Sequence, residues 1–453
     1  MTHEIGRIEP PAPPVHAQPL PSWRLIMATL RNPLATYSED SFKLPVGRVR
    51  ILGRTTIVVN HPDGVKHVLN SPAASYGRPI AATRSVRWMM GNGLFLAEGE
   101  DWRTQRRMLA PLFSPARISE LLPHFLAAGN LLLDRLEQRP EVKLSTEFDQ
   151  ATLDAVLRAL FSTPAATLGQ EIARLTRYYL EGPGRPNFGD LLARREGDFP
   201  FLAGRRRHFR TAWHKAVDAF VRTRHEGRRD SDSRDLLDIL LAARDPETGG
   251  TLSPEEVRDQ TATMLFAGFE TTARLLFWAV YLLALDQQEQ AAIREEVAAF
   301  PPERIATMQD LQNWPRLRCV LLEALRLYPP VPQLIRQALE PDEVLGERVE
   351  VGDLIWISPW TLHRHRDHWT DPNAFVPERF HGQPQPWLHG AFIPFGGGPR
   401  ICIGASFSMA EAQILIATLL NRHRIGLIDS RPVLPVGLIT TVPSYEPRFS
   451  LAS

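Results

Sequence analysis

The chain has 453 residues, 43% of them hydrophobic and 23% charged, which is the composition of a globular protein with a core large enough to stabilise itself. Its 52 basic and 51 acidic residues nearly cancel, so the overall charge gives no attraction to nucleic acid or to an anionic membrane. The two cysteines, Cys319 and Cys402, are too few for a disulfide framework and fit a reducing compartment.

The first segment, residues 1–40, is rich in proline. Its start has neither a continuous apolar run nor the apolar core of a signal peptide, so we expect an extended lead-in before one large domain over residues 41–453. No later window offers about 20 uninterrupted apolar residues, which predicts that no segment spans a membrane. We therefore expect a cytoplasmic protein.

A hairpin and a series of helices are predicted next. Residues 46–60, VGRVRILGRTTIVVN, alternate apolar and polar side chains on both sides of a Gly-Arg pair, as a β-hairpin does. From Asp101 onward, apolar residues at three-and-four spacing predict helices over residues 118–138, 170–182 and 235–245. The first of these contains a proline near its start, and we expect the helix to begin there rather than to run through it.

The longest predicted helix starts at Ser253. Serine at the cap, proline at the first helical position and Glu256 three residues after the cap form a helix-start signature, and nothing stops the helix before about Leu285. The later predicted elements are helices over 287–299, 316–328 and about 404–422, short strands over 334–358, a stretch rich in Pro, Gly, His and Arg over 359–401, and short strands from 424 to the end. The predicted fold class is mainly α with small β-sheets.

One cysteine lies in a glycine-rich stretch, FGGGPRICIG, at residues 395–404. A cysteine just before a helix gains thiolate character from the helix dipole and from neighbouring amide N–H groups. A structural zinc site would need about four Cys or His ligands, and nothing marks a partner for a Cys–His nucleophile. An iron that takes its equatorial ligands from a porphyrin needs only one thiolate. A buried, inert cysteine is the remaining alternative.

The complete spacing Phe-x-x-Gly-x-Arg-x-Cys-x-Gly resembles the signature of the cytochrome P450 family of haem-thiolate monooxygenases. The resemblance runs from about Val46 to the C-terminus, and residues 41–453 are then a single haem domain. It implies the cytochrome P450 fold, in which a long central helix and the cysteine loop enclose haem b. It places at the haem Phe395 beside the sulfur, Gly398, Arg400 at a propionate, Cys402 as axial ligand of the iron, and Gly404.

The sequence AGFETT, residues 267–272, lies near the middle of the longest predicted helix. Glycine costs about 1 kcal/mol relative to alanine in a helix interior, so Gly268 indicates either close packing, with Glu270 in solvent, or a bent and widened helix. Thr271 can hydrogen-bond the carbonyl of Ala267 and bend the helix. The resemblance implies the second alternative, with Ala267 and Gly268 beside the haem. Glu270 and Thr271 then deliver protons to bound dioxygen, as the family's acid–threonine pair does.

Further residues are assigned to the haem and to the frame around it by the same resemblance. Trp102 and Arg106 lie four apart on one face of a helix and, with Arg336, are expected to contact the propionates. Glu323 and Arg326 would form a buried triad with Arg379 that holds the cysteine loop, whereas an isolated i, i+3 pair is worth only about 0.2–0.5 kcal/mol.

A histidine-rich loop offers a different interpretation. His363, His365 and His368 suggest a metal cluster, but the resemblance favours an ordered loop in which His363, Arg364 and Trp369 match the family's register. Cys319, in LRCVLLEAL, is expected to be a buried small apolar residue.

The implied reaction inserts one atom of O2 into a substrate C–H bond and reduces the other atom to water. The chain ends about fifty residues after Cys402, so we expect a separate ferredoxin or flavodoxin to bring electrons from NAD(P)H in a bacterial-type system, with the protein itself a monomer. The candidate contacts for an acidic partner are Arg103, Arg107 and the run Arg205, Arg206 and Arg207.

An apolar substrate is expected from the residues at the family's substrate-contacting positions. These are Trp88, Met89, Met90, Phe188, Leu265, Phe266, Val331, Leu334 and Ile335. Fatty acid, terpenoid and aromatic substrates stay open. Arg78, Arg84 and Arg87 could capture a carboxylate, but we expect them on the surface.

Three alternatives to this function are open. A peroxide-dependent oxidase or an isomerase on the same scaffold would not need Glu270 and Thr271. A non-catalytic haem-binding sensor would bind haem and oxidise nothing. A haem-free thiol hydrolase would be colourless.

Overall fold

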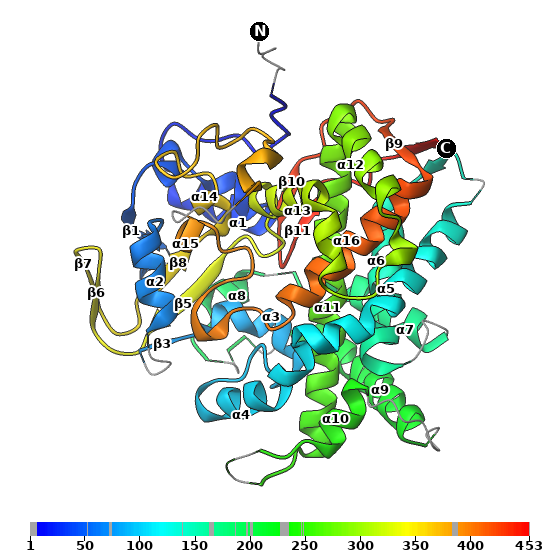
Figure 1. The fold of residues 1–453 in the computed structure, drawn as a ribbon. Helices are drawn as coiled ribbons and strands as arrows, with labels where there is room; N and C mark the ends of the chain where they lie inside the picture. Colours follow the sequence, from blue (N-terminus) through cyan, green and yellow to red (C-terminus); the bar gives the residue numbers. More distant parts are fainter. Residues whose placement is uncertain are drawn as a thin grey trace.

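The longest element of the computed structural model is helix α11 (Pro254–Leu285), which crosses the body of the molecule (Figure 1). It begins with a capping box, because Ser253 Oγ accepts the N–H of Glu256 at 3.3 Å and Glu256 Oε2 accepts the N–H of Ser253 at 2.7 Å. Its side chains are buried on nearly every side, as expected of a central core helix. The predicted helix from Ser253 to about Leu285 is confirmed.

The structure describes residues 7–51, 53–71, 75–137, 139–162, 167–185, 187–195, 198–199, 203–226, 235–245, 247, 249–382 and 388–452. Within these ranges, α11 is the one helix long and apolar enough to cross a bilayer, and 83% of its most apolar window is buried inside the protein.

The other helices divide between the two sides of α11, with most of the long ones on one side and several shorter ones beside the main sheet (Figure 1). In chain order they are α1 (Ser22–Arg31), α2 (Pro62–Asn70), α3 (Ile80–Met90), α4 (Gly99–Leu109), α5 (Pro115–Leu136), α6 (Leu144–Phe161), α7 (Thr167–Glu181), α8 (Phe188–Leu192), α9 (Gly204–Glu226), α10 (Leu236–Ala242), α12 (Gln287–Ala299), α13 (Pro315–Leu327), α14 (Pro359–Leu362), α15 (Leu388–Ala391) and α16 (Ala405–Arg422).

The main sheet has five strands in the order β1-β2-β8-β5-β3. The predicted hairpin is confirmed, since β1 and β2 pair antiparallel with Val46 opposite Val59. Strand β8 pairs parallel to β2 and antiparallel to β5. The strands of this sheet are β1 (Val46–Ile51), β2 (Arg54–Val59), β3 (Tyr76–Gly77), β5 (Leu334–Ala338) and β8 (Leu354–Ile357).

Three smaller sheets complete the predicted class of a mainly helical protein. They are β4-β12-β9, β10-β11 and β6-β7. Their strands are β4 (Glu141–Val142), β6 (Asp342–Val344), β7 (Glu347–Val349), β9 (Arg424–Leu427), β10 (Pro435–Gly437), β11 (Thr441–Pro443) and β12 (Phe449–Ala452).

One predicted boundary is wrong. Helix α5 begins at Pro115 and runs through Pro123, where we expected a helix to start. Proline removes one backbone hydrogen bond from a helix interior, but its neighbours Leu122 and Phe125 are buried in the core while Pro123 itself faces outward. Burial of the apolar face therefore outweighs the loss of one bond.

The N-terminal residues that the structure describes lie against the body of the molecule. Tyr328 Oη donates to the carbonyl of Pro11 at 2.9 Å, and the amide of Asn32 donates to the carbonyl of Pro435 at 2.9 Å. Helix α1, which lies in this segment, was not predicted from the sequence. The division at residue 40 stays a prediction.

The closest packing near the middle of α11 involves α6. A Cβ atom added at Gly268 would lie 2.9 Å from Cγ2 of Val156 on α6, a distance that real Cβ contacts essentially never show. Close packing therefore contributes to the need for glycine at residue 268. The sequence offered close packing at Gly268 together with a solvent-exposed Glu270. The second of these expectations is wrong, because Glu270 is buried.

Candidate functional site

The cysteine loop is a tight turn shaped by glycine. Gly398 has a φ of +66°, and a Cβ atom added there would lie 2.1 Å from the carbonyl oxygen of Leu69 at the end of α2, so only glycine fits. The N–H of Cys402 donates to the carbonyl of Phe395 at 2.9 Å and closes the loop. Helix α16 follows at once, with Gly404 at its cap. The sequence thus presents the Cys402 thiol at the start of a buried helix.

Cys402 is exposed as a residue, but its thiol group is surrounded by protein. The protein around this thiol is dense enough for burial to raise the pKa of the thiol. The N–H of Gly404, hydrogen-bonded to the sulfur, and the charge of Arg106 lower the pKa, but burial outweighs both. From the sequence we expected only effects that lower the pKa, from the helix dipole and from neighbouring amide N–H groups. A raised pKa differs from the lowered pKa of activated cysteine nucleophiles.

A half-exposed stripe interrupts the otherwise buried middle of α11. Ala267, Gly268 and Thr271 are partly accessible, whereas Phe266 and Phe269 beside them are buried. Thr271 Oγ1 donates to the carbonyl of Ala267 at 2.9 Å, as predicted. Accessible surface on a core helix indicates that this stripe borders a cavity.

The start of α16 is joined to α11 beside this stripe. Thr272 and Ser408 share a hydrogen bond between their hydroxyl oxygens at 3.0 Å. Ser408 lies six residues after Cys402, so the helix that follows the cysteine loop is fixed next to Thr271.

Glu270 is turned away from the accessible stripe. Its side chain is buried, its Oε1 accepts a hydrogen bond from Thr440 Oγ1 at 2.9 Å, and the same oxygen lies 3.5 Å from Nε of Arg274. The two members of the predicted acid–threonine pair therefore point in different directions from adjacent positions on α11.

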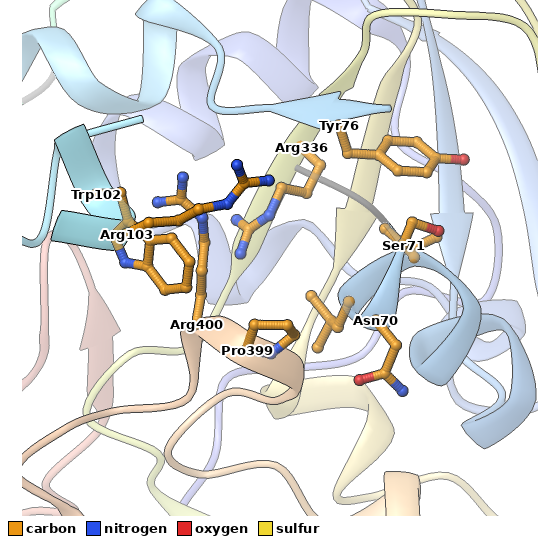
Figure 2. Close-up of a pocket in the computed structure, with 10 residues that line it drawn as sticks. Asn70, Ser71, Tyr76, Trp102, Arg103, Arg336, Pro399 and Arg400 are labelled. Carbon is orange, nitrogen blue, oxygen red and sulfur yellow. The ribbon is translucent and has the colours of Figure 1, made fainter. Parts of the chain in front are cut away.

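A pocket of about 230 Å³ lies beside the cysteine loop, which lines it with Pro399 and Arg400 (Figure 2). Arg103, Arg336 and Arg400 gather in it, with the guanidinium carbon of Arg400 at 4.6 Å from the ring centre of Trp102. The opposite wall comes from the end of α2 and from Tyr76. The structure thus brings together Trp102, Arg336 and Arg400 from three separate parts of the chain.

Positive charge exceeds negative charge beside this pocket. Glu98 pairs with Arg400 at 2.5 Å and with Arg78 at 3.2 Å, and it is the carboxylate that faces both arginines. Burial, together with repulsion from Arg400 and Arg336, lowers the pKa of Arg78 to about 9. Burial is the largest cause of this low pKa, and the charges of the two neighbouring guanidinium groups add to it against the opposing effect of Glu98.

The acid and the two arginines of the predicted triad lie together in the core. Arg326 donates through Nε and Nη2 to the two carboxylate oxygens of Glu323, each at 2.7 Å, and Arg379 Nε donates to Glu323 Oε1 at 3.2 Å. Arg326 also donates to the backbone carbonyls of His363, Pro372 and Ala374.

The candidate substrate residues divide into two groups. Met89, Met90 and Leu265 are almost fully buried and offer no surface to a ligand, contrary to expectation, and Phe266 is nearly so. Residues of the second group keep accessible surface: Trp88, Phe188, Val331, Leu334 and Ile335.

Two arginines expected at the surface, Arg84 and Arg206, are buried, and Arg78 is half-buried. Arg84 lies 3.7 Å from Asp190 and donates to the carbonyl of Asp198, and Arg78 belongs to the Glu98 cluster. Arg206, expected to meet an acidic partner, instead pairs with Asp190 at 2.6 Å in the core. These corrections share one cause, because the sequence does not reveal an acid that is distant along the chain.

The other arginines stay at or near the surface. Arg87 is half-buried, and Arg205 and Arg207 are exposed. Arg107 is largely neutralised by Asp245 at 3.1 Å and by Glu247 at 3.3 Å.

The histidine-rich loop does not assemble a metal centre. His363 is buried and its Nε2 accepts the N–H of Ile393 at 2.9 Å, whereas the rings of His365 and His368 stack on each other. Within the described ranges, no three His, Cys, Asp or Glu side chains are grouped closely enough to hold a metal ion. Cys319 is buried against Trp369 and Phe380.

Sequence reasoning missed four residues that the structure places at or behind the site: Glu98, Asp149, Arg274 and Thr440. Arg274 carried a detectable signal, since a charged residue four positions after Glu270 in an apolar helix needs a buried partner.

Comparison with known proteins agrees with this geometry. The cytochrome P450 family model matches residues 25–441. This match begins before Val46, where the resemblance in the sequence was expected to start. Cyclooctatin synthase of Streptomyces melanosporofaciens is 32% identical over 430 residues, covering 92% of this chain and 90% of that protein. Cyclooctat-9-en-7-ol 5-monooxygenase of the same organism is 30% identical, covering 88% and 86%.

A solved structure shares the fold. The crystal structure of cytochrome P450DA heme domain superposes with a TM-score of 0.80 at 24% identity, covering 99% of this chain and 98% of that one. The family model and the relatives each span most of the chain. This chain therefore belongs to the cytochrome P450 family and is a haem-dependent monooxygenase.

Proposed function

We propose that this protein hydroxylates an apolar small molecule by the reaction R–H + O2 + two electrons + two protons → R–OH + H2O. The observation that carries the proposal is Cys402, a residue with exposed surface whose thiol is nevertheless surrounded by enough protein for burial to raise its pKa. A relative that carries the name 5-monooxygenase supports the reaction type. Bound haem supplies the activation of O2, and a thiolate ligand donates electron density that favours O–O cleavage.

The residues present fit a haem. Cys402 would hold the iron, Phe395 would pack beside the sulfur, and the Gly404 N–H would share the charge of the thiolate. The excess positive charge around Arg336 and Arg400 matches two propionate groups, whose carboxylates would supply the missing anions. Arg106 and Trp102 on α4 would contact the same groups.

The proton path is the second part of the proposal. Thr271 borders the cavity, and its hydroxyl would hand protons to the reacting oxygen. Glu270, the adjacent buried acid, would take protons from the solvent side and pass them to Thr271 or to a water beside it. Ala267 and Gly268 leave room next to this hydroxyl because they carry little or no side chain.

The triad would keep the cysteine loop in place. Arg326 binds three backbone carbonyls between residues 363 and 374, and Glu323 accepts the N–H of Val376 at 2.9 Å. This anchored segment is tied to the loop because His363 accepts the N–H of Ile393, two residues before Phe395.

An apolar substrate is supported by the accessible side chains near strand β5, which are Val331, Leu334 and Ile335. The electrons would come from NAD(P)H through a ferredoxin or flavodoxin. Arg103 supports docking of such an acidic partner near the cysteine loop, because its side chain is 55% exposed and lines the pocket that also holds Arg400.

The absorption spectrum of reduced protein under carbon monoxide tests the ligand. The wild type should show the long-wavelength Soret band of a thiolate-bound carbonyl complex, and C402S should lose it completely. C319S is the matched control, since it removes the other cysteine and should keep the band. A C402S protein that retains the band, or a wild type that takes up no haem, would overturn the proposal.

A further inference from the structure

A buried charge cluster behind Glu270 joins α11 to α6. Arg274 lies one turn after Glu270, is 4% exposed, and donates to Ser145 Oγ at 2.9 Å and to Asp149 Oδ1. Ser145 and Asp149 both lie on α6. The outer nitrogens of the guanidinium are therefore held by α6 rather than by Glu270.

The bond between Arg274 and Glu270 is incomplete. Nε of Arg274 is buried without a hydrogen-bond partner, and Glu270 Oε1 lies 3.5 Å away. A buried donor left unpaired costs about 1–3 kcal/mol, so a small movement that completes this bond would be favourable. The guanidinium of Arg274 thus lies between two carboxylates: it forms a hydrogen bond with Asp149, whereas its contact with Glu270 is too long for one.

Asp149 titrates in the mildly acidic range. Burial raises its pKa to about 6, and the charge of Glu270 adds to the increase, against the lowering effect of Arg274 and of Arg177 on α7, 3.8 Å away. Glu446, in the segment before β12, also faces Arg274. These are the charged groups that meet Asp149 and its guanidinium partner from α11, α7 and the C-terminal segment.

We propose that Arg274 and Asp149 are positioning residues for proton delivery: Arg274 can clamp Glu270 away from the cavity, and ionised Asp149 draws Arg274 off so that Glu270 is free to move. The inference rests on the proposed role of Glu270 and Thr271. When Asp149 is ionised, Glu270 keeps only the bond from Thr440. When Asp149 gains a proton, Arg274 turns to the remaining carboxylate and its Nε–H completes the bond to Glu270.

Infrared spectroscopy of the resting ferric protein tests the titration without turnover. A carboxylic-acid C=O band should disappear as the pH is raised from 5 to 7 in the wild type, and D149N should lack this titrating band. Retention of the same band in D149N would show that another group titrates, which overturns the assignment.

The rate of NADPH oxidation without substrate tests the clamp, with spinach ferredoxin and its reductase as electron donors. D149N should oxidise NADPH about ten-fold more slowly than wild type at pH 7.5, as expected if the free orientation of Glu270 falls from about half of the molecules to about a twentieth. At pH 5.5, where about a quarter of Asp149 is still ionised, the wild type should fall to about a third of its rate at pH 7.5, and D149N should change little over that range.

Two further variants separate positioning from damage to the fold. The double variant D149N/R274M should recover most of the wild-type rate, because nothing charged then holds Glu270; a purely structural role predicts that the double variant is slower than D149N. D154N is the matched control, since Asp154 is another acid of α6 in an ion pair with an arginine, but its partner Arg158 lies on its own helix at 2.5 Å. It should behave as wild type.

E270Q distinguishes failure of the inference from failure of the proposed function. If E270Q leaves NADPH oxidation unchanged, Glu270 carries no protons and the proposed relay is wrong. If E270Q slows oxidation while D149N matches wild type at every pH, the relay stands and the clamp is wrong.

Discussion

Two buried ion clusters brace α13 and α11, and they are built in opposite ways. In the first, a single carboxylate, Glu323, lies between Arg326 and Arg379, and all five N–H groups of Arg326 are bound. In the second, a single guanidinium, Arg274, lies between Asp149 and Glu270, and its Nε–H has no partner.

This difference teaches where the molecule is fixed and where it can move. A guanidinium with every donor satisfied has one favourable position, because any shift breaks bonds in a dry environment. A guanidinium shared by two acids has two favourable positions, and the protonation of one acid selects between these positions. We call the Glu323–Arg326–Arg379 group the stiff cluster; it lies beside the segment that leads to the cysteine loop. We call the Asp149–Arg274–Glu270 group the adjustable cluster, and it contains the acid of the proposed proton path.

Disruption of the stiff cluster should have the largest effect on the free energy of unfolding. E323Q leaves the buried guanidinium groups of Arg326 and Arg379 without a counter-charge, and removal of one partner from a buried pair costs about 3–5 kcal/mol. Urea unfolding followed by ellipticity should show that loss, together with low haem content after purification. E347Q is the control, because its exposed pair with Arg48 should be worth no more than about 1 kcal/mol. Equal effects for the two variants would mean that the cluster does not brace the fold.

The adjustable cluster should show a smaller effect that depends on pH. The pKa of Asp149 is raised from 3.8 to about 6 in the folded protein, so the folded state binds the proton more tightly than the unfolded chain. The stabilisation is complete below about pH 4 and is lost as the pH rises through 6. D149N has no such loss, so its free energy of unfolding should gain about 1–3 kcal/mol relative to wild type between pH 4 and 6.5.

Urea titrations at four pH values between 4.5 and 7.5 measure this gain. S145A removes the other α6 partner of Arg274 without removing a titrating group, and its difference from wild type should stay constant with pH. A constant difference for D149N as well would contradict the titration of Asp149 and leave the second cluster as stiff as the first.

The stiff cluster was predictable from the sequence and the adjustable one was not. Glu323 and Arg326 are three residues apart and precede PERF in a recognisable order, and the cysteine signature occupies ten consecutive residues. Such local spacing survives in the sequence because helices and tight turns impose it, whereas the link from Glu323 to Arg379, 56 residues away, came from the resemblance to the cytochrome P450 family.

Arg274 lies four residues after Glu270, but the other members of this cluster are distant along the chain, and no periodicity connects them. Thr440 is 170 residues away, and Arg274 meets Asp149 across 125 residues. The same limit explains why Arg84 and Arg206 were placed on the surface, since both are buried against Asp190 of a short helix. Charge alone predicts exposure, and only tertiary packing shows which charges are paired.

The smallest expected effect concerns the contact that holds α6 against α11 next to the adjustable cluster. G268A gains about 1 kcal/mol of helix propensity, but its Cβ would lie 2.9 Å from Val156, and overpacking costs about 1–3 kcal/mol. We expect a net loss of about 1 kcal/mol in free energy of unfolding. In the double variant G268A/V156A the strain is relieved, so the two changes should couple favourably by about 1 kcal/mol in a double-mutant cycle.

The cycle also separates the two reasons for glycine at residue 268. If G268A keeps wild-type haem content and loses only stability, packing against Val156 is the reason that residue 268 is glycine. If it keeps its stability but loses haem, the reason is room at the cavity, and Gly268 belongs with Thr271 rather than with the helix contact. A pH-dependent loss, confined to the range in which Asp149 titrates, would show that the spacing of α6 and α11 sets how strongly Asp149 draws Arg274 away from Glu270.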